Sequence, residues 1–443
     1  MKATTKIIAV FCLTLVACTL VGCNLFTKGS FTALGTPEDP PSLAYSDIKK
    51  EDFMAFKAKL EDFNATFSSV AYLESNTNRA NVAISPVSVY MALAMAVECT
   101  AGQTRAQILD ALGMTYDEVE KYTSLLFRQL DVDNVRQNKT VGRLDLYNSI
   151  WIDDGLAYNQ NAVENLAGKY FCYSNSTDFD GDNVGANKAV RNFIKEKTNK
   201  LIDKDFELGE ETIFALINTL YLKDVWNDIG KNLNFASGTY TFQNSNGSTK
   251  DVSLLQPSYL TINVIEGENY RTAYTMTESG YKIKFILPKE NCSVNQIFTA
   301  ETLREVAGIT DYKGIDEENR IEYHTRVLFP EFKASYDGEI SGILKNTFGV
   351  TDAFSAEKAD FSPFIADSGQ VAYLGKVQHV TELNVDKKGI EGAAVTLMQG
   401  AGSAAPPPYT KVYQDFIIDR AFGFIITDYY DTTIFSGVVN GVN

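Results

Sequence analysis

The 443-residue sequence predicts an α+β fold, because helices come first along the chain and most strands come later. From Phe53 to Val70, apolar residues recur at steps of three and four, which is typical of the buried face of a helix. The segment from Ile213 to Leu222 is an almost unbroken apolar run, which predicts a central strand buried on both faces. A doubly wound fold would instead alternate strands with helices.

Capping signals place further helices after the first. Ser85-Pro86 combines a cap residue with a first-turn proline, at the start of a helix that runs to about Val97. Residues 104–107 have the spacing of a capping box, and Gly113 closes that helix. Another helix is predicted over residues 187–199.

The remaining strands are predicted from short apolar runs between turn signals. A brief one is expected at Val82–Ile84, before the second helix. The later ones are expected at Ile283–Leu287, Arg326–Phe332, Val371–Val385, Phe416–Thr427 and Ile434–Val439.

The first residues have the features of a bacterial lipoprotein leader. Lys2 and Lys6 precede an apolar run from Ile7 to Leu20, which is too short to span a membrane and is typical of a signal peptide. The sequence Leu-Val-Gly-Cys that ends at Cys23 resembles a lipobox, whose cysteine is lipidated and becomes the new N-terminus. An ordinary secretory signal is the alternative.

This interpretation divides the chain into a leader, a tether and one domain, and it predicts a domain outside the cytoplasmic membrane, anchored to the cell envelope by lipid. The tether is inferred from its prolines and small turn residues. The expected ranges are 1–22 for the signal peptide, 23–48 for the lipidated Cys23 and its flexible tether, and 49–443 for the domain.

Composition argues against several classes of function. Loss of Lys2 and Lys6 with the leader lowers the formal charge from −16 to −18, so the domain should repel nucleic acid. Three cysteines then lie outside the leader and carry no lipid. They lack the spacing of a disulfide framework or zinc site. With two histidines in the whole chain, a multi-histidine metal site is not expected, and no cofactor is predicted.

The segment from Gly389 to Ala405 is unusual for a loop, because it is small, apolar and almost uncharged. If Ile390 points inward in an extended strand, Glu391 points to solvent, whereas a one-residue slip would bury that charge. The first proline, which could not join a central ladder, comes only at Pro406. The pattern predicts a loop that can become a strand; a merely flexible Gly/Ala-rich loop is the alternative.

Several motifs, in order along the chain, resemble those of the serpin family. The resemblance covers nearly everything from residue 49 onward. It is carried by Asn81–Met114, Leu216–Trp226, Phe329–Phe332, Ala359–Ser362, Gly389–Thr396 and Phe422–Ile425.

The resemblance implies a serpin fold, with early helices packed on three β-sheets and an exposed reactive-centre loop at about residues 387–410. It also implies that, after a protease cuts this loop, the loop inserts into the large central sheet A as an additional strand. The acyl-linked protease would then be trapped. The hinge positions that it implies are Lys387, Gly389, Ile390, Gly392, Ala393, Ala394 and Thr396.

Family spacing from Gly389 places the reactive bond at Ser403–Ala404, with the neighbouring bonds at Gly402 and Ala405 as alternatives. These small residues suit a serine protease with a shallow primary pocket, as in elastase or subtilisin. Papain-like cysteine proteases are a second class of partner. Chymotrypsin-like targets rank lower, because cleavage after Leu397 or Met398 would leave too short a strand to insert fully.

By the same resemblance, a polar cluster lies beneath the sheet where it must open, and two residues lie at the sheet top. Hydrogen bonds within the cluster would let strands part without leaving buried groups unpaired. A Ser–His hydrolase site is the competing interpretation, but the sequence has no nucleophile elbow. The cluster residues are Ser85, Ser88, Asn218 and His379, and the sheet-top residues are Trp226 and Glu331.

Two departures from the family pattern concern the sheet top. Lys387 and Glu331 stand where serpins usually have Glu and Lys, and we hypothesise that an ion pair survives with its charges exchanged. Asp224 stands where the family has Gly, so the local geometry before Trp226 is left open.

The sequence therefore predicts a monomeric suicide inhibitor of serine proteases. It would have no nucleic-acid partner and would meet the membrane only through its lipid. A non-inhibitory serpin that acts as a surface binding or carrier protein is the alternative, since Ile390 is larger than the residue often found at that hinge position.

Overall fold

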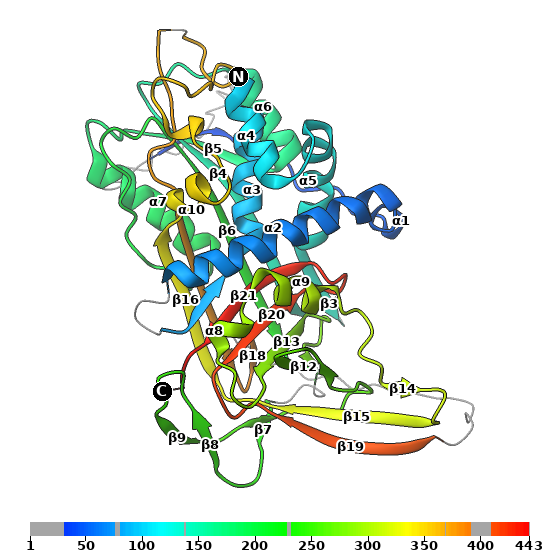
Figure 1. Ribbon diagram of the computed structural model, residues 1–443. Coiled ribbons are helices and arrows are strands. Elements are labelled where there is room, and N and C mark those ends of the chain that lie inside the picture. Colours follow the sequence, from blue (N-terminus) through cyan, green and yellow to red (C-terminus); the bar gives the residue numbers. More distant parts are fainter. Residues whose placement is uncertain are drawn as a thin grey trace, which may run out of the picture.

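The computed structural model describes residues 31–75, 80–136, 139–227, 232–367, 369–390 and 409–442. The expected α+β class is confirmed, with most helices before residue 200 and most strands after it. Helix α2 crosses the middle of the molecule, and β15 and β19 project from one end (Figure 1). None of the helices in these ranges is both long enough and apolar enough to cross a bilayer.

The first two long helices confirm the sequence predictions, since α2 contains the predicted apolar face and α3 begins at Pro86. The predicted helix near residue 187 starts earlier, where the Asp182 side chain accepts a hydrogen bond from the Gly185 N–H. The helices are α1 (Tyr45–Ile48), α2 (Glu51–Ser75), α3 (Pro86–Cys99), α4 (Gly102–Leu112), α5 (Tyr116–Leu130), α6 (Gln160–Tyr170), α7 (Asn183–Lys197), α8 (Val294–Ile297), α9 (Ala300–Gly308) and α10 (Ser341–Asn346).

The large sheet has the order β1-β5-β4-β6-β18-β17-β16, and β3 pairs with β4 outside this path. The predicted central strand is β6, which lies in the middle of the sheet. The strands are β1 (Thr32–Gly35), β3 (Val132–Arg136), β4 (Lys139–Asp153), β5 (Cys172–Thr177), β6 (Phe214–Val225), β16 (Phe332–Glu339), β17 (Gln378–Asp386) and β18 (Gly389–Ile390).

A second sheet has the order β11-β12-β13-β20-β21-β2, and a third has the order β14-β15-β19. Two short pairs, β7–β10 and β8–β9, complete the strands of the described residues. Their bounds are β2 (Val82–Ile84), β7 (Asn234–Phe235), β8 (Tyr240–Gln243), β9 (Thr249–Val252), β10 (Leu255–Gln256), β11 (Ile265–Glu266), β12 (Tyr270–Met276), β13 (Lys282–Pro288), β14 (Ile315–Asp316), β15 (Ile321–Leu328), β19 (Thr410–Ile417), β20 (Phe422–Thr427) and β21 (Thr433–Val439).

Helix α3 lies between the first two sheets, because it contacts both β6 and β21. Almost every residue of α3 is buried, and α2 covers it from the other side with aromatic residues such as Phe56 and Phe67. Burial of such a core supplies most of the favourable free energy of folding. The helix thereby fixes the two sheets relative to each other.

Three predicted strands are wrong in their bounds. The segment Arg326–Phe332 is two strands, because Pro330 cannot donate to a ladder and the chain changes sheets there. Residues 371–377 precede β17 without strand pairing, and the backbone N–H of Leu374 donates to Ala353 instead. The segment Phe416–Thr427 is also divided, between β19 and β20.

The predicted capping box at residues 104–107 is wrong as well. Helix α4 begins at Gly102, and the Thr104 hydroxyl accepts from the backbone N–H of Asp360 instead (3.0 Å). A capping box does form at the next helix, where the Thr115 hydroxyl accepts from the Glu118 N–H and the Glu118 carboxylate accepts from the Thr115 N–H.

The region expected to be a flexible tether is partly folded. Strand β1 pairs with β5 at the edge of the large sheet, and the Arg128 guanidinium donates to the carbonyl groups of Pro41 and Ser42. An unpaired sheet edge offers a row of hydrogen-bonding groups, which explains why this segment is held. Within the described residues, the first folded element therefore starts at Thr32, earlier than residue 49.

We expect Thr115→Ala to lower the free energy of unfolding by about 1 kcal/mol, because an N-cap hydroxyl is lost. Thr115→Ser keeps the hydroxyl and should retain most of the stability. Urea unfolding midpoints of the two variants and the parent measure this. Equal losses in both variants would contradict a role for the hydroxyl.

Candidate functional site

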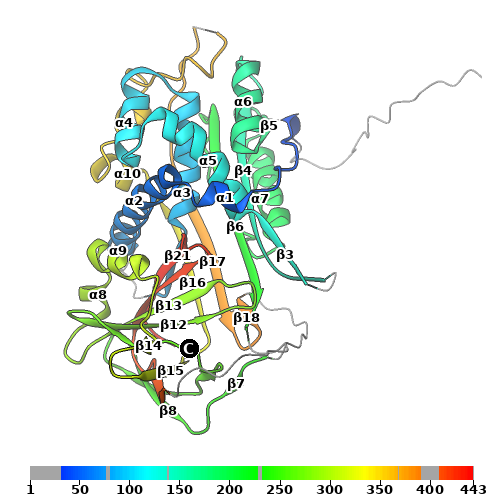
Figure 2. The same ribbon diagram turned by 90° about the vertical axis from the view of Figure 1, so that its right-hand side faces the viewer.

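The hinge begins inside the large sheet. The two residues of β18 pair antiparallel with β6 on one side and with β17 on the other. Ile390 lies between Asp224 and Val385 and is fully buried. Strands β6 and β17 run along the same sheet, and β18 joins them at one end (Figure 2).

Gly389 is required by a close approach of two backbones. A Cβ at this position would collide with the carbonyl oxygen of Asp224. Its φ of 152° is also a conformation that favours glycine. Glycine is therefore required at position 389 by the neighbouring strand β6 as much as by the conformation of its own turn.

Three contacts fix the turn between β17 and β18. Trp226 is buried, and its indole N–H donates to the carbonyl of Asp386 (2.7 Å). The backbone N–H of Leu233 donates to the carbonyl of Lys387 (2.7 Å). The Glu331 carboxylate accepts from the backbone N–H of Lys387 (2.9 Å). The turn is thus held by residues that lie outside the strands of the large sheet.

The hypothesised ion pair between Lys387 and Glu331 is not formed in the described part of the chain. The two residues do meet, but through the Lys387 backbone, while the Lys387 side chain is exposed. The amide at this turn has no ladder partner, so the carboxylate satisfies it and the ammonium stays in water.

The structure resolves the geometry at Asp224, which the sequence left open. Its side chain is fully buried, and the carboxylate accepts from the backbone N–H of Ser279 (2.9 Å), the Ser279 hydroxyl (3.0 Å) and the backbone N–H of Val225 (2.9 Å). Burial raises the pKa of Asp224 to about 6, against the effect of these donors.

Beyond β18, the facing edges of β6 and β17 form no ladder with each other among the residues described. Two small pockets of about 50 Å³ each lie there, lined by Leu216 and Ile217 of β6 and by Val377 and Gln378 beside and within β17. Helix α3 and Phe206 form other parts of their walls. The space continues the line of β18 between the two strands.

The predicted polar cluster is divided between the two sides of this space. On the β17 side, the Ser85 N–H donates to Nε2 of His379 (3.2 Å), and the hydroxyl groups of Ser85 and Ser88 are hydrogen-bonded (2.9 Å). On the β6 side, the Asn218 amide donates to the side-chain oxygen of Asn148 (2.7 Å). The side-chain oxygen of Asn218 is buried without a protein partner in the described residues.

His379 is held in its neutral form. Burial lowers its pKa to about 4, and its Nε2 must be unprotonated to accept from Ser85. The rings of Phe67 and Tyr336 pack beside it, with centroids 6.2 and 5.5 Å from that of the imidazole. No acid orients this histidine among the contacts described, so the geometry does not resemble a hydrolase triad.

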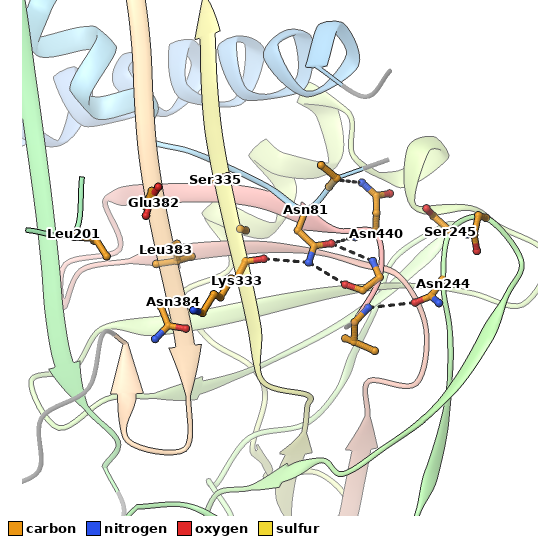
Figure 3. A pocket seen from close by; sticks show the side chains of 15 residues that line it. Asn81, Leu201, Asn244, Ser245, Lys333, Ser335, Glu382, Leu383, Asn384 and Asn440 are labelled. Atoms are coloured by element: carbon orange, nitrogen blue, oxygen red, sulfur yellow. Dashed lines mark hydrogen bonds between the residues drawn. The ribbon is translucent and has the colours of Figure 1, made fainter. Parts of the chain in front are cut away.

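A larger pocket of about 650 Å³ lies beside β16 and the C-terminal segment (Figure 3). Its central amide is already used: the Asn81 side chain donates to the carbonyl groups of Lys333 and Gly441 and accepts from the backbone N–H groups of Asn440 and Gly441. Asn81 therefore ties the end of the chain to the sheet edge, and its amide is not free for a ligand.

Several predicted site residues lie outside the described residues. They are Cys23, the hinge positions Gly392, Ala393, Ala394 and Thr396, and the reactive-bond positions Gly402, Ser403, Ala404 and Ala405.

Sequence reasoning missed Asn148 and Thr381, which complete the polar lining. The Asn148 amide donates to the carbonyl of Tyr170 (2.6 Å), and the Thr381 hydroxyl donates to the carbonyl of Ala83. Both residues occupy inward positions of apolar strands, and a polar residue at such a position is the signal that could have revealed them.

Replacement of His379 tests its buried neutral state. Its folded pKa of about 4 lies below the ordinary value near 6.5, so its stabilisation is present above pH 6.5 and is lost as the pH falls toward 4. Relative to His379→Gln, the parent should lose about 3 kcal/mol over this window. Urea unfolding from pH 7 to pH 4 measures both proteins, and parallel curves would contradict burial of a neutral imidazole.

Comparison with known proteins places this chain among serpins of many organisms. A serpin-like protein of Methanosarcina acetivorans is 25% identical over 435 residues, which cover 96% of this chain and 94% of the relative. The corticosteroid-binding globulin of Ovis aries is 26% identical, with 84% and 82% covered. The alpha-1-antiproteinase of Callosciurus caniceps is 24% identical, with 82% and 84% covered.

Solved structures show the same fold. The native state of tengpin, a thermophilic serpin, superimposes with a TM-score of 0.70 at 24% identity, covering 92% of this chain and 97% of tengpin. Thyroxine-binding globulin in complex with thyroxine gives a TM-score of 0.67 at 20% identity, with 86% and 99% covered. The family model for serpins (serine protease inhibitors) matches residues 62–441, and the chain therefore belongs to the serpin family.

Proposed function

We propose that this serpin inhibits serine proteases by inserting its cleaved reactive loop between β6 and β17. The observation that carries the proposal is β18, whose two residues already pair with both strands. Ile390, the bulky hinge residue, is fully buried there. The size of Ile390 had raised doubt about insertion, but the side chain fits the buried position between β6 and β17 that insertion requires.

The free energy of insertion supports the proposal. A strand of about a dozen residues would form on the order of ten or more ladder hydrogen bonds, each contributing about 1 kcal/mol net. This sum is comparable with the whole stability of a typical domain, about 5–15 kcal/mol. Insertion could therefore deform a protease that remains acyl-linked to the end of the loop.

The proposed targets are proteases that accept small residues. The reactive bond is proposed at Ser403–Ala404, with Gly402 and Ala405 as its neighbours. An elastase- or subtilisin-like primary pocket fits these side chains, and papain-like cysteine proteases remain a second class.

A carrier function is the second candidate, and it is favoured by two relatives. One is named a corticosteroid-binding globulin, and the other was solved as thyroxine-binding globulin with thyroxine. The two pockets between β6 and β17, each about 50 Å³, are too small for a drug-sized ligand. We rank inhibition first, because both residues of β18 already pair with β6 and β17.

We also propose that the protein acts at the bacterial cell envelope, anchored through lipid on Cys23. The signal-like sequence of residues 1–22 and the lipobox-like motif that ends at Cys23 support this placement. Incorporation of labelled palmitate, and its loss in Cys23→Ala, would test the anchor.

Incubation with an elastase-like protease tests inhibition. We expect a covalent complex that survives denaturing electrophoresis, and cleaved protein that melts well above the intact form, because the loop has become a strand. Ile390→Glu is the matched control, since a buried charge should block insertion and turn the protein into a substrate. Clean turnover of the parent with an unchanged melting temperature would favour the carrier function.

A further inference from the structure

Asp224 is the second of the two residues of β6 with which the hinge strand β18 pairs, after Val225. Its backbone is opposite Ile390 of β18, and its side chain points to the turn between β12 and β13. Both oxygens of the carboxylate are used there, one by the Ser279 N–H and the other by the Ser279 hydroxyl. One residue thus contacts the inserting strand and the second sheet.

The backbone reinforces this connection. The N–H of Glu278 donates to the carbonyl of Val225 (2.8 Å), and Trp226 forms a β-bridge with Thr277. The end of β6 is therefore attached to the 277–279 segment by main chain and side chain together. The Asp224 carboxylate provides the side-chain part through its contacts with Ser279.

The strand on the other side of β6 has a glycine that accommodates this carboxylate. A Cβ on Gly142 of β4 would collide with the Asp224 carboxylate and with the Ser279 hydroxyl, 2.7 Å away. Gly142 therefore leaves the space that the Asp224 carboxylate and its hydroxyl partner occupy.

We propose that the Asp224–Ser279 contact is a positioning device that holds the end of β6 one strand-width from β17, so that both residues of β18 keep their pairing with β6. This proposal rests on the proposed inhibitory function. Without the contact, only the main-chain links hold the end of β6 to the 277–279 segment, so β6 can move toward β17 more easily and expel Ile390. Insertion after cleavage would then start from a closed sheet and would proceed more slowly.

Slower insertion raises the number of inhibitor molecules consumed for each protease trapped, and this stoichiometry can be measured. After acylation, the protease is either trapped by insertion or released by hydrolysis of the acyl bond. A slower insertion step leaves more time for hydrolysis, so more inhibitor is consumed for each protease trapped. Asp224 acts through the hinge and does not touch the protease, so the rate of the first encounter should stay unchanged.

The experiment compares Asp224→Asn and Ser279→Ala with Asp428→Asn at pH 8. Asp428 is another buried carboxylate, which accepts from the backbone N–H groups of Tyr430 and Thr432 in the turn between β20 and β21. It is a control for general loss of stability. The readouts are hydrogen exchange of residues 389–390 in the uncut protein and the stoichiometry of inhibition of an elastase-like protease.

We expect Asp224→Asn to accelerate exchange at residues 389–390 about tenfold, the factor that corresponds to one lost charge-assisted hydrogen bond. The stoichiometry of inhibition should rise several-fold at an unchanged association rate, with a smaller rise for Ser279→Ala and none for Asp428→Asn. Lower melting temperature in Asp224→Asn with parent-like hinge exchange would overturn the proposal.

The two readouts separate the positioning role from the inhibitory function. If the parent forms no covalent complex, the proposed function fails, and hinge exchange alone still decides whether Asp224 keeps β18 paired with β6. If the parent inhibits and Asp224→Asn exchanges faster at the hinge with an unchanged stoichiometry, the positioning role in inhibition is refuted.

Discussion

Two neighbouring strands of the large sheet, β6 and β17, are joined only through the two residues of β18 among the residues described. Backbone amides and carbonyls are strong hydrogen-bonding groups, so a sheet interrupted in its middle can gain a complete set of ladder bonds. The other features of the site follow from this interruption. Some of these features keep the gap between β6 and β17 narrow, and others line it with polar groups. A third set fixes the end of the gap at which a strand would enter.

The polar residues beneath the sheet fit this constraint. The group around His379 belongs to β17 and the start of α3, whereas Asn218 and Asn148 belong to β6 and β4. Each group forms its hydrogen bonds on its own side, so the strands can separate without breaking bonds between the groups. Asn218 retains a buried acceptor, which is available to a donor that arrives between the strands.

Much of this arrangement could be predicted from the sequence, because it is encoded in local patterns. The helix face of α2, the proline at the start of α3 and the apolar run of β6 depend on periodicity and residue type. The face alternation around Ile390 also indicated its burial. The strand ends near Pro330 and Val377 were wrong, because they depend on which sheet the chain joins, and that is decided by contacts distant in sequence.

The sheet top was the least predictable part, because its geometry also depends on contacts between residues that are distant in sequence. The exchange of charges between Lys387 and Glu331 suggested an ion pair, but an unpaired backbone amide competed for the carboxylate. Asp224 could not be interpreted without Ser279 and Gly142, which lie far away along the chain. Buried carboxylates need donors, and sequence alone does not show where those donors come from.

A crystal structure of the protein cut in its reactive loop tests the central claim most directly. The account predicts that the chain continues from Ile390 as a strand between β6 and β17 and reaches the level of Asn218 and His379. The Asn218 side-chain oxygen would then lie beside the new strand. A cut protein in which β6 and β17 pair directly with each other, with the freed segment outside the sheet, would contradict it.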